Sequence, residues 1–394
     1  MLQLRWLDSL AALSSEQWDR LFADPPGNAN VNPFCCHAFL LALEQGGSVD
    51  GNSGWRSRHL TVWQDEHLIA AVPGYIKTHS YGEYLFDWQI AEAYQQYGLK
   101  YYPKWIAAIP FTPVTGPRLG LLDTALADSV LPIIVAALRQ QLQLAAISCV
   151  QWLYISKALQ QQLSAQGFLA RQDVQFLWHN RGYSSFDDFL QQLNSRKRKQ
   201  IKQERQRVAG FTIKTLNGAD ISAQDWQSIN RCYQATYLKR SGHHGYITEH
   251  SFKLIKDSMA ASLLVFAAYA TDDSETDEAP KLLAAALCFK SADTLYGRYW
   301  GALTQAEHLH FELCYYQGID YCIAHGLTRF DAGAQGEHKL KRGFEPVTRY
   351  GSYLFADTPL SPAIAQYFKH EAEHLMNYQQ AAISALPFKQ SEHK

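Results

Sequence analysis

The chain has 394 residues, 47% of them hydrophobic, and a formal net charge of -1. This length exceeds what one hydrophobic core usually serves, so two domains are expected. A charge near zero excludes a global attraction to nucleic acid or membranes, and any anionic ligand must meet a local basic cluster. The N-terminal sequence MLQLRWLDSL does not resemble a signal peptide, and no stretch approaches the roughly 18 apolar residues of a membrane span. These features predict a cytoplasmic protein and leave its oligomeric state open.

The first half of the chain alternates predicted helices with predicted strands. Its helices are predicted at residues 14–22, 37–44, 89–98 and 131–144. Its strands are predicted at residues 58–63, 68–76, 83–88, 105–109 and 149–155. In this pattern the helix at 89–98 takes the place of a crossover helix.

The second half shows a clearer order. Strands are predicted at residues 211–216, 263–269, 282–289, 294–300 and 328–332, and helices at 222–237, 248–259 and 309–325. In the last helix, apolar residues recur every three or four positions from Leu309 to Leu327, and Gly326 is placed to end it. The order of elements is similar to that of a GNAT acyltransferase unit.

The two halves repeat one order, which predicts internal duplication. The expected fold class is α/β with a mixed sheet, built from two tandem GNAT-like acyl-CoA N-acyltransferase units. We place the N-terminal unit at residues 1–185 and the C-terminal unit at residues 186–394. An unrelated pair of α/β domains is the alternative.

Two polar segments of the first half could bind a substrate. Lys77 begins a segment dense in polar and aromatic residues, KTHSYGEYLFDW, and YYPKW follows soon after. The loop PFTPVTGPR contains three prolines and a glycine, and it presents Thr112, Thr115 and Arg118. A rigid loop loses little entropy when it orders around a ligand, so this loop suits binding.

A third polar segment runs through YGRYW. Tyr296 and Arg298 share one strand face, and an arginine among aromatic residues needs an anion or a carboxylate. Arg298 could therefore bind substrate or pair internally with Glu312 or Asp331. No metal site is expected, because His308 and Glu312 have no further ligands at suitable spacing and the seven cysteines contain no CxxC.

The segment GEHKLKRGF brings two kinds of catalytic group together. Acyl transfer to an amine needs positive charge at the developing oxyanion and a group that accepts the amine proton. Both kinds occur within six residues, which makes candidates of Glu337, His338, Lys339, Lys341 and Arg342. The alternative is a solvated basic turn.

The strongest run of charge is SRKRKQIKQERQR, residues 195–207. Arg198, Lys202 and Arg205 fall on one helical face and could follow the phosphates of RNA or of a nucleotide-linked precursor. A solvated helix face is the alternative.

Seven stretches in order resemble the FemAB-like family of peptidoglycan biosynthesis or recognition proteins: NPFCCHAFLLALE, GYIKTHSYGEYLFDW, YYPKW, PFTPVTGPR, LYGRYWGA, LHFELCYYQGIDY and GAQGEHKLKRGF. The resemblance covers residues 32–344 and implies a duplicated GNAT fold. It also implies kinship with Fem-type transferases, which add amino acids from aminoacyl-tRNA to peptidoglycan precursors. In those enzymes a lysine near the last crossover strand helps to hold the donor or to stabilise the charged intermediate. Lys339 is the matching residue, although the order Gly343-Phe344 allows the match to slip to Lys341.

The sequence departs from ordinary acetyltransferases before both expected crossover helices. GNAT enzymes hold the acetyl-CoA pyrophosphate with a QxxGxG/A-type loop. FDWQIAEAY and ALTQAEHLHFE lack this pattern. The leading hypothesis is therefore a transferase that moves an acyl or aminoacyl group onto an amine, possibly of a peptidoglycan precursor, from aminoacyl-tRNA or acyl-CoA and without a tightly bound cofactor. The alternatives are a non-catalytic binding module and an acetyl-CoA-dependent N-acetyltransferase.

Overall fold

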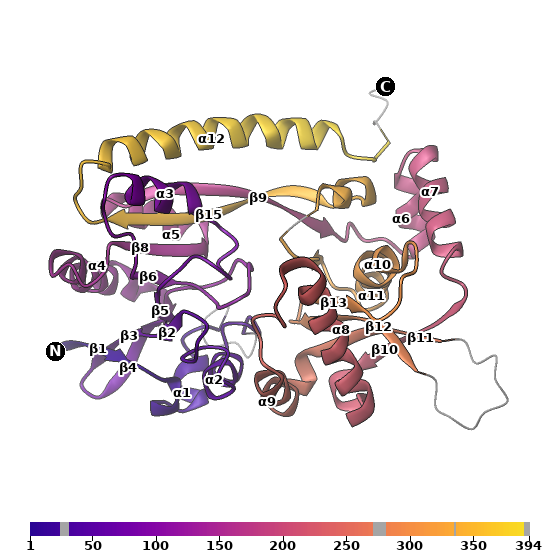
Figure 1. Cartoon of the computed structure of the whole chain (residues 1–394), viewed down its shortest axis with the longest axis horizontal. Coiled ribbons are helices and arrows are strands. Elements are labelled where there is room, and N and C mark those ends of the chain that lie inside the picture. The colour runs from indigo at the N-terminus through magenta and orange to yellow at the C-terminus, as the bar shows by residue number, and fades with distance from the viewer. Residues whose placement is uncertain (24–30, 271–280, 335, 390–394) are drawn as a thin grey trace. The chain divides into compact units, whose positions relative to one another are not determined.

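The computed structural model describes residues 1–23, 31–270, 281–334 and 336–389 (Figure 1). The chain forms two compact units. Unit 1 comprises Met1–Val174, Tyr246–Ile255 and Thr348–Tyr378, and unit 2 comprises Gln175–Gly245, Lys256–Val347 and Gln379–Lys394. The chain passes between the units within strands β9 (Leu169–His179) and β15 (Glu345–Phe355). The expected boundary between the units at residue 185 stays a prediction.

Unit 1 contains strands in two sheets. One is a four-stranded antiparallel sheet of order β1-β3-β4-β7, formed by Leu2–Leu7, His59–Gln64, His67–Val72 and Gly120–Leu121. The other has the order β2-β5-β6-β8-β15, with strands Trp55–Ser57, Gly74–Lys77, Lys104–Ala107 and Cys149–Ile155 before β15. In this second sheet only β6 and β8 are parallel.

The helices of unit 1 follow the predicted positions closely. They are α1 (Ser15–Asp19), α2 (His37–Gln45), α3 (Trp88–Gln96), α4 (Ala127–Gln143) and α5 (Lys157–Ala165), together with most of α9 (Glu249–Met259) and α12 (Ser361–Ser384). Helix α5, helix α12 and the strands β1 and β15 were not expected.

The crossover helix of unit 1 is α4, and the expectation that it is the helix at 89–98 is wrong. A crossover helix joins two parallel strands along the chain. Helix α4 follows β6 and precedes β8 in the sequence, and β6 and β8 are parallel. Helix α3 lies between β5 and β6, which are antiparallel. The apolar face of α3 led to the wrong prediction, because periodicity indicates which side of a helix is buried and does not indicate which strands the helix joins.

Helix α4 packs into the core of unit 1 through Val130, Ile134, Val135 and Leu138. By length and composition alone, the stretch Thr124–Gln143 could cross a membrane. The buried face of α4 is that of a core helix, which meets the same criteria.

The strand predicted at residues 83–88 is also wrong. These residues form an irregular loop that leads into α3. Tyr84 has a positive φ of 63°, which a regular strand does not allow. Among the described residues this loop has no strand partner, and the ion pairs of the buried Glu83 and Asp87 with Lys104 hold it in position.

Unit 2 has the element order of a GNAT unit. Helices α6 (Phe186–Gln192) and α7 (Ser195–Gln206) come first. They are followed by β10 (Phe211–Asn217), α8 (Ala223–Ser241), β11 (Leu263–Ala270), β12 (Leu282–Lys290) and β13 (Thr294–Ala302). A helix then leads to β14 (Arg329–Asp331) and to the short 3-10 helix η6 (Glu337–Arg342).

The sheet of unit 2 has the order β10-β11-β12-β13-β14-β9. All neighbours are antiparallel except β13 and β14, which the predicted helix from Leu309 connects as a crossover. Two glycines allow helices to approach this sheet closely. A Cβ at Gly301 would meet the Cys232 backbone of α8, and one at Gly318 would meet the Phe330 ring of β14.

The crossover helix of unit 2 is not regular. It begins as α10 (Leu309–Phe311), continues as a π-helical turn at Glu312–Tyr316, and ends as α11 (Gln317–Ala324). A π-helical turn shifts the side chains after it by about 100° around the helix, and such turns often occur at functional sites. Apolar spacing alone did not reveal this turn.

Candidate functional site

The candidate site of unit 2 begins where two parallel strands stop pairing. Strands β13 and β14 pair only from Thr294 with Arg329 to Tyr296 with Asp331. Strand β13 then continues to Ala302, while β14 ends at Asp331. The pairing of β12 with β13 shifts by one residue, so Arg298 is the extra residue of a bulge. The bulge changes the direction of β13 beside the end of β14.

Arg298 pairs internally with Asp331, one of the two partners considered from the sequence. Their atoms Nη1 and Oδ1 are 3.3 Å apart, and both side chains are almost fully buried. The guanidinium also lies 5.6 Å from the ring centroid of Tyr296. Tyr296 itself is 8% exposed. In this structure the pair therefore holds the end of β14 against β13.

Lys339 completes this group of residues. Its side chain is 1% exposed, and its ammonium donates a hydrogen bond to the carbonyl of Gly333. The N–H of Gly333 in turn donates to Asp331 Oδ1 at 3.1 Å. The positive φ of Gly333, 92°, places the loop in a conformation that favours glycine. A buried positive charge is thus held just after the last residue of β14.

The other charged residues of the GEHKLKRGF segment face different surroundings. Glu337 and Lys341 are exposed, so they do not share the burial of Lys339. Arg342 is buried and pairs with Glu204 of α7 at 2.7 Å, and its guanidinium lies 3.6 Å from the ring centroid of Phe311. Arg342 thus connects η6 to α7. Gln335, the residue before this segment, lies outside the described residues.

His338 has a neighbour that the sequence reasoning missed. Its Nε2 lies 2.7 Å from the hydroxyl of Tyr315, and its ring centroid lies 5.9 Å from that of His310. Burial, followed by the nearby charge of Arg342, lowers the pKa of His338. Burial and the charge of His338 lower the pKa of His310 to about 3.

The two rings are therefore mostly neutral near pH 7, and a neutral imidazole nitrogen can accept a proton. The helix that carries His310 has an irregular start, where His308 has a φ of 64°.

Glu312 belongs to a different cluster from Lys339. It lies on the π-helical turn, is 2% exposed, and pairs with Arg205 at 3.0 Å. Burial raises the pKa of its carboxyl group. Arg205 also pairs with Asp320 at 2.8 Å and lies 4.4 Å from the ring centroid of Phe186. Arg205 is therefore held by two carboxylates, so the alternative of a solvated helix face does not apply at this position.

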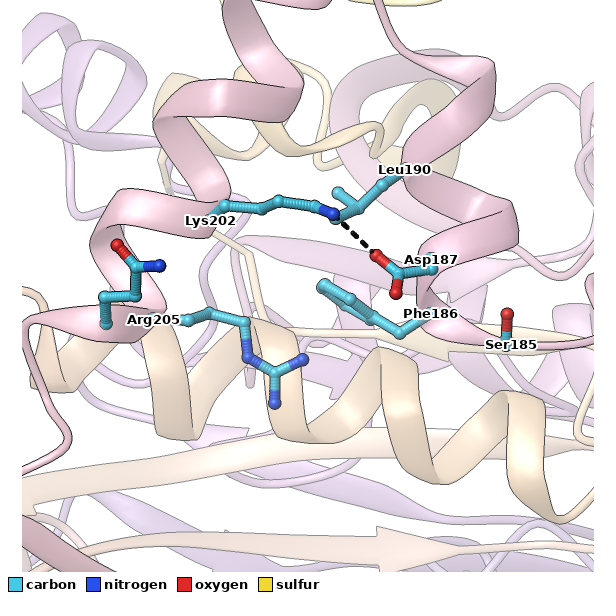
Figure 2. A pocket seen from close by; sticks show the side chains of 7 residues that line it. Ser185, Phe186, Asp187, Leu190, Lys202 and Arg205 are labelled. Carbon is cyan, nitrogen blue, oxygen red and sulfur yellow. Dashed lines mark ion pairs between the residues drawn. The ribbon is translucent and has the colours of Figure 1, made fainter.

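A pocket of about 390 Å³ lies between α6 and α7. Figure 2 shows Lys202 and Asp187 directed toward each other across it, with their charged atoms 3.0 Å apart. Both side chains are more than half exposed, so water and salt screen this pair. An anionic ligand could replace Asp187 as the partner of Lys202 at small cost. Arg198, the third residue of the predicted basic face, is partly exposed on the same helix.

The candidate binding residues of the first half all lie in unit 1. Arg118 is fully buried and donates to the carbonyl of Val114 at 2.6 Å, so it closes the loop PFTPVTGPR on itself. Thr112 is buried and bonds to the carbonyl of Pro110 at 2.9 Å. Thr115 is partly exposed and accepts from Arg349 at 3.2 Å. These contacts hold the loop itself, and a role in binding stays a prediction.

Lys77 and a group around Lys104 form the most polar part of the unit 1 core. Lys77 is fully buried, and its ammonium lies 4.2 Å from the ring centroid of Trp55. Burial lowers the pKa of Lys77 to about 7. Lys104 is also fully buried and pairs with Asp87 at 2.6 Å and Glu83 at 2.8 Å.

The two carboxylates around Lys104 differ in their protonation. Burial raises the pKa of Glu83 to about 7 in spite of the nearby lysine. Burial also acts on Asp87, but Lys104 and hydrogen bonds from Ser80 and Tyr101 outweigh it and lower its pKa to about 2. The sequence motifs KTHSYGEYLFDW and YYPKW contain all of these residues. Only their convergence in space was missed.

Within the described ranges, no group of three or more histidine, cysteine, aspartate or glutamate side chains is arranged to hold a metal ion. The groups described above offer hydrogen-bond donors, a buried cation and proton acceptors. That chemistry suits acyl transfer to an amine.

Comparisons with solved structures show the fold. FemX matches with a TM-score of 0.53 at 11% identity, covering 92% of this chain and 100% of FemX. The C-terminal domain assigned to a lysylphosphatidylglycerol synthetase of Agrobacterium fabrum matches with a TM-score of 0.53 at 12% identity, covering 91% of this chain and 96% of that domain. A tandem GNAT protein from the clavulanic acid biosynthesis pathway has a TM-score of 0.45 at 10% identity, covering 91% of this chain and 99% of that protein.

The likenesses to FemX and to the Agrobacterium fabrum domain, together with the topology, confirm the predicted α/β fold class with GNAT-like units. No curated protein matches the chain. A family model described as FemAB-like, peptidoglycan biosynthesis/recognition, matches residues 9–390. Because this match spans nearly the whole chain, the protein belongs to the FemAB-like family.

Proposed function

We propose that the protein is a transferase that moves an acyl or aminoacyl group onto an amine of a peptidoglycan precursor. Membership of the FemAB-like family supports the substrate class. The observation that carries the reaction is the buried ammonium of Lys339 beyond the end of β14, on the same short helix as the neutral ring of His338.

These two side chains supply what the reaction needs. The amine nitrogen attacks the acyl carbonyl, a C–N bond forms, and the carbonyl oxygen becomes negative. Lys339 would stabilise this oxyanion, and low solvent exposure strengthens that interaction. His338 would accept the amine proton and return it to the leaving oxygen or sulfur as the ester or thioester bond breaks. Tyr315, which contacts His338, would keep the ring in position.

The donor is proposed to be aminoacyl-tRNA, with acyl-CoA as the second candidate. The residues before the crossover helix of unit 2, LTQAEH, contain no glycine. In unit 1 the crossover helix is α4, and its preceding segment, PFTPVTGPRLGLLDTAL, also lacks a QxxGxG/A pattern. Neither segment therefore offers the usual pyrophosphate loop of CoA enzymes. Arg198 and Lys202 on α7 would contact donor phosphates. Donors of both kinds are cytoplasmic molecules, in agreement with a cytoplasmic protein.

The deciding experiment incubates the full chain with a panel of charged tRNAs and acyl-CoAs, each with peptidoglycan precursors that carry a free amine. Mass spectrometry detects the acylated acceptor, and equilibrium binding is measured for each component. Transfer from a tRNA donor supports the proposal, and transfer from acetyl-CoA alone identifies an N-acetyltransferase. Saturable binding of precursors with no transfer from any donor would instead identify a non-catalytic binding module.

A further inference from the structure

Unit 1 presents a cluster of exposed and partly exposed aromatic rings that the transfer reaction does not use. Tyr81, Tyr84, Phe86 and Trp88 form this aromatic platform. The ring centroids of Tyr81 and Trp88 are 5.0 Å apart, and those of Phe86 and Trp88 are 5.7 Å apart with an interplanar angle of 20°. Tyr81 is 54% exposed and Trp88 is 38% exposed. Large aromatic side chains gathered at a surface commonly mark a binding site.

The loop that carries the platform is held by hydrogen bonds from buried side chains. The carbonyl of Tyr81 accepts hydrogen bonds from Trp55 Nε1 at 3.1 Å and from Lys77 Nζ at 3.2 Å. Ser80 and Asp87, at the two ends of this loop, both receive hydrogen bonds from the buried ammonium of Lys104. The rings are thus positioned before a ligand arrives, which reduces the entropy lost on binding.

The charge around the platform indicates which ligand it suits. The segment from Thr78 to Leu99 contains no lysine or arginine. Of its acidic residues Glu83 and Asp87 are buried and Glu92 is exposed. Nucleic acids and anionic membranes both need cationic side chains next to such rings. This surface therefore disfavours phosphate-bearing partners.

The composition of the platform also distinguishes it from an ordinary apolar contact face. Leu85 and Ile90, the large aliphatic residues next to the platform rings in the sequence, are each 3% exposed. What remains at the surface is aromatic rings with polar neighbours such as Gln89. The face of a pyranose ring presents polarised C–H groups that pack on the negative face of an aromatic ring. Its hydroxyl groups need hydrogen-bonding partners at the rim of the site.

We propose that the aromatic platform binds the pyranose rings of an uncharged glycan. The binding itself does not depend on the transfer reaction. The identity of the glycan rests on the proposed function: a peptidoglycan precursor would supply an N-acetylated sugar.

The test measures binding of the full chain to the β-1,4-linked tetramer of N-acetylglucosamine by isothermal titration calorimetry. We expect saturable binding, and we expect Trp88→Ala and Tyr81→Ala each to weaken it by about tenfold or more, as for central aromatic contacts. Tyr97→Ala is the matched control, because Tyr97 is a 66% exposed tyrosine at the C-terminal cap of α3, outside the platform. Far-UV circular dichroism checks that each variant is folded.

Several outcomes would overturn the proposal. One is that the wild-type chain does not bind the sugar at millimolar concentrations. Another is that folded Trp88→Ala binds the sugar with wild-type affinity. The third is that Tyr97→Ala loses as much sugar affinity as the platform variants. Binding of phosphatidylcholine vesicles or of single-stranded RNA that depends on Trp88, without sugar binding, would assign the platform to another partner and also overturn it. Lys339→Ala separates the two proposals, since it should slow transfer by about 100-fold or more and leave sugar binding intact.

Discussion

The ammonium of Lys339 donates a hydrogen bond to the carbonyl of Gly333, two residues beyond the end of β14. Through Gly333 and Asp331 this contact continues to Arg298 at the bulge of β13. The charge of Lys339 is therefore fixed to the sheet at the point where β13 and β14 stop pairing. Lys341, two residues later, is exposed.

Transfer should depend on a neutral His338. Because burial and neighbouring cations lower its pKa below the usual 6.5, the rate should stay level near pH 7 and fall as acid protonates the ring at lower pH. His338→Gln should remove this acid dependence and reduce kcat about 100-fold. The measurement is a pH profile of kcat/KM for both proteins, with circular dichroism at each pH. A variant that keeps the wild-type profile would exclude His338 as the base.

The buried group around Lys104 should contribute strongly to the stability of unit 1. Lys104→Ala leaves the charges of Asp87 and Glu83 without their partner in a region closed to water. Removal of one partner from such a group typically costs about 3–5 kcal/mol of unfolding free energy. Urea denaturation measures this loss. The control is Lys202→Ala, whose exposed pair with Asp187 should contribute less than about 1 kcal/mol. Equal losses in the two variants would contradict the difference in burial.

The basic residues of α7 should separate into two classes. Arg205 pairs with the buried Glu312, so Arg205→Ala should lower the unfolding free energy by about 2 kcal/mol. Arg198→Glu and Lys202→Glu should leave stability nearly unchanged, weaken tRNA binding, and reduce the salt dependence of that binding. Filter binding at several salt concentrations, together with thermal melting, measures both effects. Stable variants with unchanged tRNA affinity would show that α7 has no role in donor binding.

Much of the fold could be predicted from local pattern. The strand at residues 149–155 was placed at its observed bounds, and the order of strands and helices in unit 2 was correct. Apolar alternation and helical periodicity reflect burial, which dominated these segments. The same signals do not report strand direction, and α3 was therefore taken for the crossover helix that α4 provides.

The candidate site could be predicted only in part. Lys339 stood out because its neighbours combine charge with glycine, and the structure shows it buried at the end of β14. His310 could not be found, because its approach to His338 depends on an irregular helix start and on contacts between residues 28 positions apart. Arg205 and Lys104 show the same limit, since their carboxylate partners lie in other segments of the chain.

The central claim is that Lys339 carries the charge that transfer requires. The most direct test compares kcat of Lys339→Ala with that of Lys341→Ala, using the donor and acceptor identified by the panel and checking the melting temperature of both. We expect Lys339→Ala to lose about 100-fold in kcat or more, as on removal of one group that stabilises an oxyanion. Lys341→Ala, which removes an exposed charge on the same short helix, should stay within about twofold of wild type. A folded Lys339→Ala protein that keeps wild-type turnover would contradict the claim.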